Sequence, residues 1–285
     1  ISGIKKVSYD IKGDTVNNAS RLETVSDNGM ILISVMTYEL VKEFFDCEYF
    51  GKLPVKYKDD LQMYKVKGLK PEYSFNEEGV IPNEAFRIKF GLIQFTDIQE
   101  IILDKLEMDL PGHLFYHNVK HTVDVVTEVE LIGWAEGCSD EEILVLKTAA
   151  LFHDAGHIIV YDNHEYYGTQ IAREILPVFN YTSHQIDRIC TLIMSTKLPP
   201  KPTNLLENII CDSDLDYLGR SDFIPVSNTL YEELKAQNKM GSLNDWNKIQ
   251  VKFISGHQYF TKTARRLREV NKQLQIERIQ SLITE

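Results

Sequence analysis

The sequence predicts an α+β chain in which a small α/β segment precedes an all-α helical bundle. Strand-like alternation is confined to residues 30–66, whereas apolar residues recur at helical spacing from about residue 85 onward. The stretch between these parts, residues 69–84, is rich in Gly, Pro and Asn, which is typical of a linker. We therefore expect one domain over residues 1–68 and a second, helical domain over residues 85–285.

Short strands and one helix are expected in the first part. Residues 30–35 form a β-rich apolar run, and Thr37 offers an N-cap for a helix that reaches Phe45. Residues 53–58 and 61–66 alternate in polarity on either side of an Asp-Asp pair, which predicts a β-hairpin.

The second part is a series of predicted amphipathic helices. Apolar residues recur at helical spacing near residues 93–106, 116–135, 140–157, 164–177, 182–195, 203–219, 227–237 and 244–280. A proline-rich stretch at 199–202 interrupts the pattern, and Asn204 then offers a cap for the next helix. This succession of helices predicts the all-α bundle.

Composition limits the partners of the chain. Its 285 residues carry a formal net charge of −11, which argues against nucleic-acid binding because such surfaces need clustered Lys and Arg. The four cysteines form no Cys-x-x-Cys pair, and no apolar run is long enough to span a bilayer. We therefore expect a cytoplasmic chain with reduced thiols and no membrane segment. It begins at Ile1, and we expect it to be part of a longer protein.

Histidines gather in a way that is unusual for an acidic chain. Six of the eight lie within residues 113–164. His117 and His121 are four residues apart, as are His153 and His157, so each pair shares one face of a helix. Three histidines are interpreted as ordinary structural residues: His113, His184 and His257.

Aspartates complete the pattern. Asp154 directly follows His153, and residues 210–216 place three aspartates in an apolar helix, where buried carboxylates need partners. Imidazole nitrogens together with carboxylate oxygens are what a divalent ion prefers. Such an ion would give an acidic chain the positive centre that a phosphate substrate requires. The pattern leaves the metal open among Mn, Fe, Zn, Mg and Ni, and its number at one or two.

These motifs resemble the HD-domain superfamily of metal-dependent phosphohydrolases. The resemblance spans about residues 85–285 and rests on Leu-Phe-His-Asp-Ala-Gly-His at 151–157, with a histidine before it and an aspartate-containing helix after it. It implies a helical bundle with four metal ligands: His121, His153, Asp154 and Asp214.

The Tyr-His-Asn sequence at 116–118, followed by His121, resembles the signature of class I cyclic-nucleotide phosphodiesterases in the same superfamily. The resemblance implies that His117 protonates the leaving oxygen while His121 binds metal. These enzymes have a longer domain and hold the base with a glutamine and an aromatic residue. No such clamp is evident in the sequence.

Three further residues lie where several HD families hold a second metal or its waters: His157, His164 and Glu165. Two interpretations stay open for them, ligation of a second metal and hydrogen bonding around the first. Lys197 is interpreted as an exposed loop lysine rather than as a phosphate contact.

The N-terminal residues 9–23 resemble the motif of class III nucleotide cyclases, and the predicted hairpin continues the resemblance. It implies that Asp10 reads the purine with Lys56 as its partner. It also implies that Asn17 orients the ribose and Arg21 contacts the phosphate. The two metal-binding aspartates of that family lie upstream of this motif, so we expect an inactive cyclase fragment, and a homodimer through the cyclase part in the parent protein.

Together these patterns predict hydrolysis of a phosphate ester and favour a cyclic-nucleotide phosphodiester as the substrate. A metal-bound hydroxide would attack phosphorus in line, with Asp154 and Asp214 holding the metal and His117 as general acid. Two alternatives stay open: hydrolysis of nucleoside mono- or triphosphates, and a non-catalytic metal-binding sensor or dimerisation module. The expected partner of the enzyme is a small nucleotide.

Overall fold

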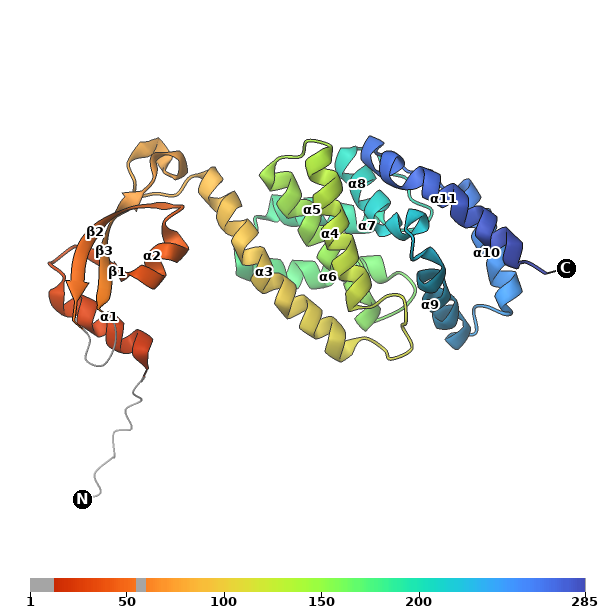
Figure 1. Cartoon of the computed structure of the whole chain (residues 1–285), viewed down its shortest axis with the longest axis horizontal. Coiled ribbons are helices and arrows are strands. Elements are labelled where there is room, and N and C mark those ends of the chain that lie inside the picture. Colours follow the sequence, from red (N-terminus) through yellow and green to blue (C-terminus); the bar gives the residue numbers. More distant parts are fainter. Residues whose placement is uncertain (1–12, 55–59, 285) are drawn as a thin grey trace, which may run out of the picture. The chain divides into compact units, whose positions relative to one another are not determined.

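The computed structural model describes residues 13–54 and 60–284 and divides the chain into two compact units, Ile1–Lys89 and Phe90–Glu285 (Figure 1). A small sheet lies in the first unit, and the second is built from helices. The predicted α+β fold class is therefore confirmed. Among the helices of the described residues, none combines the length and apolar composition needed to cross a bilayer.

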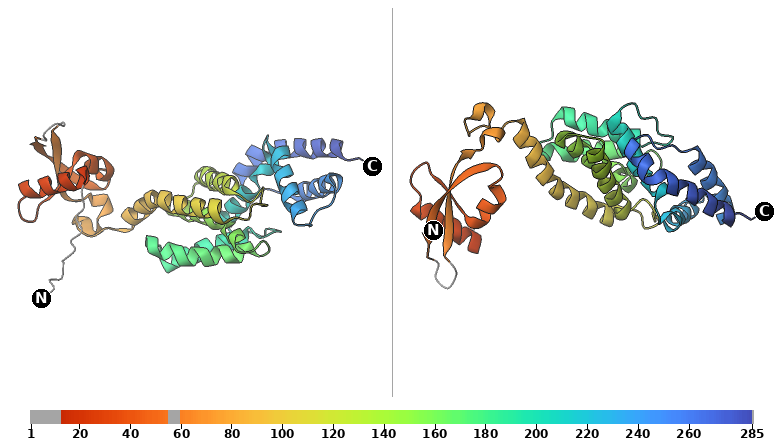
Figure 2. Two further views of the ribbon diagram at one scale, coloured as in Figure 1. Left: turned by 90° about the horizontal axis from the view of Figure 1, so that it is seen from below. Right: turned by 45° about the horizontal axis from the view of Figure 1, so that its top comes forward.

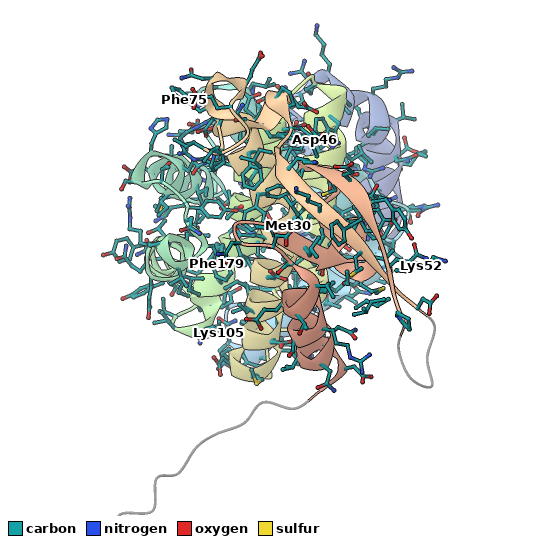
Figure 3. The ribbon with its side chains drawn as sticks, turned by 90° about the vertical axis from the view of Figure 1, so that its left-hand side faces the viewer. Met30, Asp46, Lys52, Phe75, Lys105 and Phe179 are labelled. Carbon is teal, nitrogen blue, oxygen red and sulfur yellow. The ribbon has the colours of Figure 1, made fainter. Side chains whose placement is uncertain are left out.

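A three-stranded antiparallel sheet and two helices form the first unit. In chain order its elements are α1 (Asp14–Val25), β1 (Ile31–Ser34), α2 (Val35–Val41), β2 (Phe45–Leu53) and β3 (Leu61–Leu69). The strands are arranged in the order β1-β3-β2, and Figure 3 places Asp46 and Lys52 toward the two ends of β2. Leu22 of α1 and Met63 of β3 are among its buried apolar residues.

The predicted hairpin is present, but its first strand lies earlier in the chain than expected. β2 pairs with β3 from Phe45 to Leu53, and most of the strand predicted at 53–58 lies outside the described residues. The predicted helix is also shorter, because α2 begins after Ser34 rather than Thr37 and ends before Phe45. Phe45, the last residue that helical periodicity had assigned to the helix, instead pairs with Leu69 of β3.

The segment expected as a linker belongs to the first unit and is hydrogen-bonded within itself and to the rest of that unit. It contains two short 3-10 helices, η1 (Pro71–Tyr73) and η2 (Phe75–Glu77), and an isolated bridge between Ser74 and Pro82. The N–H of Lys70 donates to the carbonyl of Phe44 at 2.9 Å.

Helices of the second unit follow one another closely. They are α3 (Glu84–Asp109), which starts in the first unit, α4 (Val119–Ala135), α5 (Asp140–Phe152), η3 (Ala155–Ile158), α6 (His164–Ile175), η4 (Leu176–Phe179), α7 (Ser183–Ser195), α8 (Leu205–Asp214), η5 (Asp216–Gly219), α9 (Phe223–Ala236), α10 (Leu243–Gly256) and α11 (Lys262–Leu282). Local sequence determines where several begin, since Ser139, Thr182 and Ser242 each form a capping box that satisfies the first free N–H groups.

Three of the predicted helices are interrupted, and one of them, over 203–219, is divided between α8 and η5. The helix predicted over 140–157 ends early, and the one over 244–280 is divided between α10 and α11. Between α10 and α11 the buried carboxylate of Asp212 accepts the backbone N–H groups of Phe260 and Thr261 at 2.8 and 2.7 Å. A tertiary partner thus replaces helical hydrogen bonds at this point, which periodicity alone does not reveal.

The helical unit has two hydrophobic clusters. The larger one includes fully buried residues of α3, α4, α5 and α7, such as Ile98 and Val129, and the smaller one lies among η5, α9, α10 and α11, which Figure 2 shows at the C-terminal end. Cys211 of α8 belongs to the larger cluster, whereas Leu215 belongs to the smaller one. Asp214 therefore lies where the two clusters meet.

Candidate metal centre

The four predicted ligands come from three separate helices and meet at one place. His121 is in the first turn of α4, His153 is the C-cap of α5 and precedes Asp154, and Asp214 ends α8. The Nε2 atoms of the two histidines are 3.3 Å apart, and each lies 3.2–3.5 Å from Asp154 Oδ2 and from Asp214 Oδ1. Ligand atoms about 2.1 Å from one ion lie ~3.0–3.4 Å apart at right or tetrahedral angles, so this spacing fits a shared divalent ion.

A hydrogen bond directs the Nε2 lone pair of His153 toward the other ligands. The Nδ1–H of His153 donates to the carbonyl of Ala150 at 2.7 Å, which leaves Nε2 as the basic nitrogen. Asn118 caps α4 by accepting the backbone N–H of His121. The Oδ2 atom of Asp154 is buried and, among the described residues, has no hydrogen-bond partner. A divalent ion would satisfy this oxygen, so the residues present fit the group that they are predicted to hold.

Charge at the site favours a cation. Burial opposes protonation of His153, but the adjacent carboxylate of Asp154, together with Asp214, outweighs burial and raises the pKa of His153 well above its usual value. Burial likewise opposes ionisation of Asp154, yet its neighbours His153 and His117 hold the pKa of Asp154 well below its usual range. The centre thus attracts positive charge, either protons or a metal.

A second group of side chains faces the other oxygen of Asp154. Its Oδ1 atom lies 3.3 Å from Nε2 of His164 and 3.8 Å from Nε2 of His157. Burial lowers the pKa of His157 to about 3, and neither of its ring nitrogens has a hydrogen-bond partner in the described part of the chain. Nitrogens of His117 and His157 and an oxygen of Asp154 lie within 4.8 Å of one another, and Glu165 Oε1 is 3.8 Å from His164. Asp154 therefore stands between two groups of potential ligands.

His117 is held by a residue that sequence reasoning missed. Glu233 of α9, which is fully buried, accepts the backbone N–H groups of Tyr116 and His117 with Oε2 and the Nδ1–H of His117 with Oε1. This carboxylate leaves Nε2 as the ring nitrogen of His117 that is available to the site. The only available signal was a glutamate at a core-facing position of an apolar helix.

A cavity of about 650 Å³ opens beside these residues. One side is formed by His117, Asp154 and their neighbours, and another by apolar residues of α9 and α10: Leu230, Leu234, Trp246, Ile249 and Phe253. Gln250 also lines it, is 3% exposed, and carries an amide oxygen with no hydrogen-bond partner among the described residues. Lys197 lines the cavity too and donates to the side chain of Asn163 at 3.2 Å.

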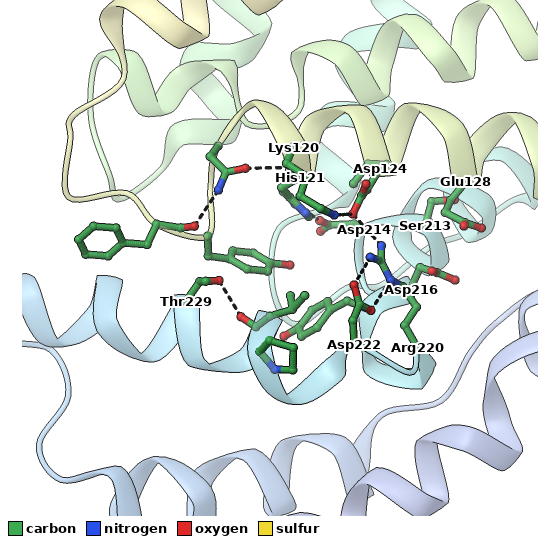
Figure 4. A pocket seen from close by; sticks show the side chains of 17 residues that line it. Lys120, His121, Asp124, Glu128, Ser213, Asp214, Asp216, Arg220, Asp222 and Thr229 are labelled. Atoms are coloured by element: carbon green, nitrogen blue, oxygen red, sulfur yellow. Dashed lines mark hydrogen bonds and ion pairs between the residues drawn. The ribbon is translucent and has the colours of Figure 1, made fainter.

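A smaller cavity of about 260 Å³ adjoins the same centre and shares Asp214 with the larger one (Figure 4). Arg220 lies between Asp124 and Asp222 in this view, and its guanidinium donates to their carboxylates at 2.7 and 2.8 Å. Arg220 is thereby neutralised, whereas a buried oxygen of Glu128 and one of Asp216 in this cavity have no hydrogen-bond partner among the described residues.

The cyclase-like positions are only partly visible. Asn17 and Arg21 lie one turn apart on α1, while Asp10 and Lys56 lie outside the described residues. Their proposed roles in nucleotide contact remain predictions.

Two family profiles match the chain. The Adenylate and Guanylate cyclase catalytic domain matches residues 1–68, and the HD domain matches residues 118–217, a range that includes all four predicted ligands. The resemblances to the HD-domain superfamily and to the nucleotide cyclases are thereby confirmed.

Individual relatives agree with these matches. The chain is similar to adenylate cyclase type 9 of Gallus gallus, at 35% identity over 89 residues, which are 31% of this chain and 6% of that protein. It is also similar to guanylate cyclase of Toxoplasma gondii, at 43% identity over 72 residues, which are 24% of this chain and 2% of that protein. It therefore spans only a small fraction of these relatives.

Among solved structures, the fold is similar to that of Bacillus subtilis YpgQ, with a TM-score of 0.50 and 19% identity over 67% of this chain and 95% of that one. At this identity the likeness concerns the fold alone. The chain thus contains an HD domain, preceded by a fragment of an adenylate and guanylate cyclase catalytic domain.

Proposed function

We propose that this chain is a metal-dependent phosphohydrolase that opens a cyclic-nucleotide phosphodiester. The observation that carries the proposal is the position of His117, whose free Nε2 faces the cavity within reach of Asp154 and the ligand cluster. When bound, a divalent ion would supply a Lewis acid for the phosphoryl oxygens and lower the pKa of the attacking water.

Each side chain of the site has one task in this proposal. His121, His153, Asp154 and Asp214 hold the ion. The carboxylates of Asp154 and Asp214 accept hydrogen bonds from the attacking water and orient it toward phosphorus. His117 donates the proton on Nε2 to the departing O3′, while Glu233 keeps its ring in place.

The residues of α10 that line the larger cavity favour a nucleotide over a small phosphate ester as the substrate. Phe253 and Ile249 offer an apolar surface for a base, and Gln250 is one helical turn from Phe253 with an unpaired amide oxygen. An amide offers both donors and an acceptor, so it can pair with the edge of a purine. We propose that Gln250 and Phe253 form the base clamp that was not evident in the sequence.

We further propose that His157, His164 and Glu165, together with Asp154, would hold a second ion. Because His157 is buried without a hydrogen-bond partner in the described residues, a ligand role accounts for it better than a hydrogen-bonding role. Metal analysis tests this: wild type should bind two ions per chain and His157→Ala one. Equal content in both would leave only the hydrogen-bonding interpretation.

Lys197 favours a second candidate, hydrolysis of nucleoside mono- or triphosphates. Its ammonium lies on the cavity and would neutralise an additional phosphate. Under this candidate, Lys197→Met weakens binding of triphosphates and leaves cyclic nucleotides unaffected.

A substrate screen decides among these functions. The purified chain is analysed for metal and then assayed with added Mn on cAMP, cGMP, other nucleotides and bis-p-nitrophenyl phosphate. We expect cyclic nucleotides to be opened, Asp154→Asn to be inactive, and Asp187→Asn, a change on the exposed face of α7, to be fully active. Cleavage of acyclic nucleotides alone would favour the second candidate, and bound metal without any turnover would favour a sensor. The same chain should make no cyclic nucleotide from ATP or GTP.

A further inference from the structure

Tyr161 and His117, the proposed general acid, are hydrogen-bonded to the same carboxylate oxygen of Glu233. It lies in the loop between η3 and α6, and its hydroxyl donates to Glu233 Oε1 at 3.1 Å. The same oxygen accepts the Nδ1–H of His117. Glu233 Oε1 thus has two donors, one from the predicted acid and one from a loop at the cavity.

The ring of Tyr161 is also in contact with Lys239. Lys239, in the loop between α9 and α10, places its ammonium 4.1 Å from the ring centroid and 2.7 Å from the carboxylate of Asp162. Such a cation–π contact contributes modestly, but together with the ion pair it ties the two loops across this part of the cavity. Both contacts favour the ring orientation in which the hydroxyl reaches Glu233.

We propose that Tyr161 is a positioning residue for His117, acting through Glu233 rather than touching the reacting atoms. This inference rests on the proposed role of His117 as general acid. Without the hydroxyl, Oε1 keeps a single donor, and the buried carboxylate can rotate to regain a second partner. The imidazole would follow it, and Nε2 would lose its alignment with the departing oxygen.

A positioning role differs from a stabilising role in one measurable respect. A general acid helps a poor leaving group strongly and a good one hardly at all, because a stable leaving anion needs no proton. Loss of stability, or loss of a substrate contact, would lower turnover or raise KM equally for both kinds of ester.

The experiment compares kcat and KM on diaryl phosphates from bis-p-nitrophenyl phosphate to diphenyl phosphate, so it does not require a nucleotide substrate. For Tyr161→Phe we expect kcat to fall about tenfold on diphenyl phosphate and less than about twofold on the p-nitrophenyl ester, with KM unchanged. Lys239→Met, which frees the ring but keeps the hydroxyl, should change in the same direction by less. Tyr231→Phe is the matched control, because its hydroxyl donates to the carbonyl of Gly241 instead.

The variant His117→Ala distinguishes a failure of the role proposed for Tyr161 from a failure of the role proposed for His117. If His117→Ala loses more on the poor leaving group but Tyr161→Phe loses equally on every ester, the role of Tyr161 is overturned and the acid stands. If His117→Ala itself loses equally on all esters, the proposed acid is overturned.

A second readout does not depend on turnover. In the NMR spectrum of the metal-free chain, the Nδ1 proton of His117 is assigned by its absence in His117→Ala. We expect it to exchange with water faster in Tyr161→Phe than in wild type. An unchanged exchange rate would contradict the proposal.

Discussion

Glu233 receives both the backbone N–H and the ring Nδ1–H of His117, one on each carboxylate oxygen. Glu233→Gln retains the shape but replaces one acceptor with an NH₂ group, which cannot accept either donor. We expect kcat on a cyclic nucleotide to fall about a hundredfold, because His117 is displaced. KM should change little, because the residues of α10 that line the cavity are unaffected. Steady-state kinetics check this against Glu232→Gln, the exposed neighbour on α9. A kcat like that of wild type would remove Glu233 from the mechanism.

Gly156 allows η3 to approach α6 closely. A Cβ at this position would lie 1.9 Å from the carbonyl oxygen of His164 and 2.8 Å from the backbone nitrogen of Gly168, so backbone would have to move. We expect Gly156→Ala to destabilise the fold by ~3 kcal/mol or more and to reduce bound metal. Denaturant unfolding and metal analysis measure both effects. Gly112→Ala, whose Cβ would meet nothing within 4 Å, should change neither.

Protons and metal should compete at His153. The pKa of His153 is raised in the metal-free fold, and Nε2 must lose its proton before it can ligate. Metal affinity should therefore rise with pH until the folded-state pKa is passed. The free energy of unfolding of the metal-free chain should change in the opposite direction. Protonated His153 contributes fully to stability below the pKa that it has in the unfolded chain, and this contribution is lost as pH rises through its folded-state pKa. Calorimetric titration with Mn at several pH values tests this, and an affinity independent of pH would contradict it.

His257 should make the fold sensitive to acid. Burial lowers its pKa to about 4, and within the described residues neither ring nitrogen has a hydrogen-bond partner. Since the unfolded chain binds this proton from about pH 6.5 downward, the free energy of unfolding should rise with pH between about 4 and 6.5, by about 3 kcal/mol from this residue. Denaturant unfolding across that range should show a smaller slope for His257→Gln. His184→Gln, at an exposed position, should keep the wild-type slope.

Gln250 should affect binding rather than chemistry. Gln250→Leu keeps the α10 wall apolar but removes the only amide that the cavity presents from that helix, among the residues described. We expect a roughly tenfold or greater rise in KM for cyclic nucleotides, because a base edge would be left unpaired on binding. Turnover of bis-p-nitrophenyl phosphate should be unchanged. Equal KM values for cyclic nucleotides would show that the base is held elsewhere.

By itself, the sequence determined the local parts of the candidate site. The spacing of His117 and His121, the adjacency of His153 and Asp154, and the cap formed by Asn118 each involve residues within four positions of one another. Short spacing in the chain keeps these residues close together in the fold. The expected shared helix faces are wrong, however, because His117 precedes the N-cap Asn118 of α4, and His157 lies in η3 rather than in α5 with His153.

Only the tertiary structure decided which distant side chains meet. Glu233 is 116 residues beyond His117, and Gln250 reaches the same cavity from α10. The strand β2 was misplaced for a related reason, since its partner β3 and not its own periodicity settles where it lies. Packing of the two hydrophobic clusters sets these long-range positions. A local sequence pattern does not reveal which residues far apart in the chain will be brought together by that packing.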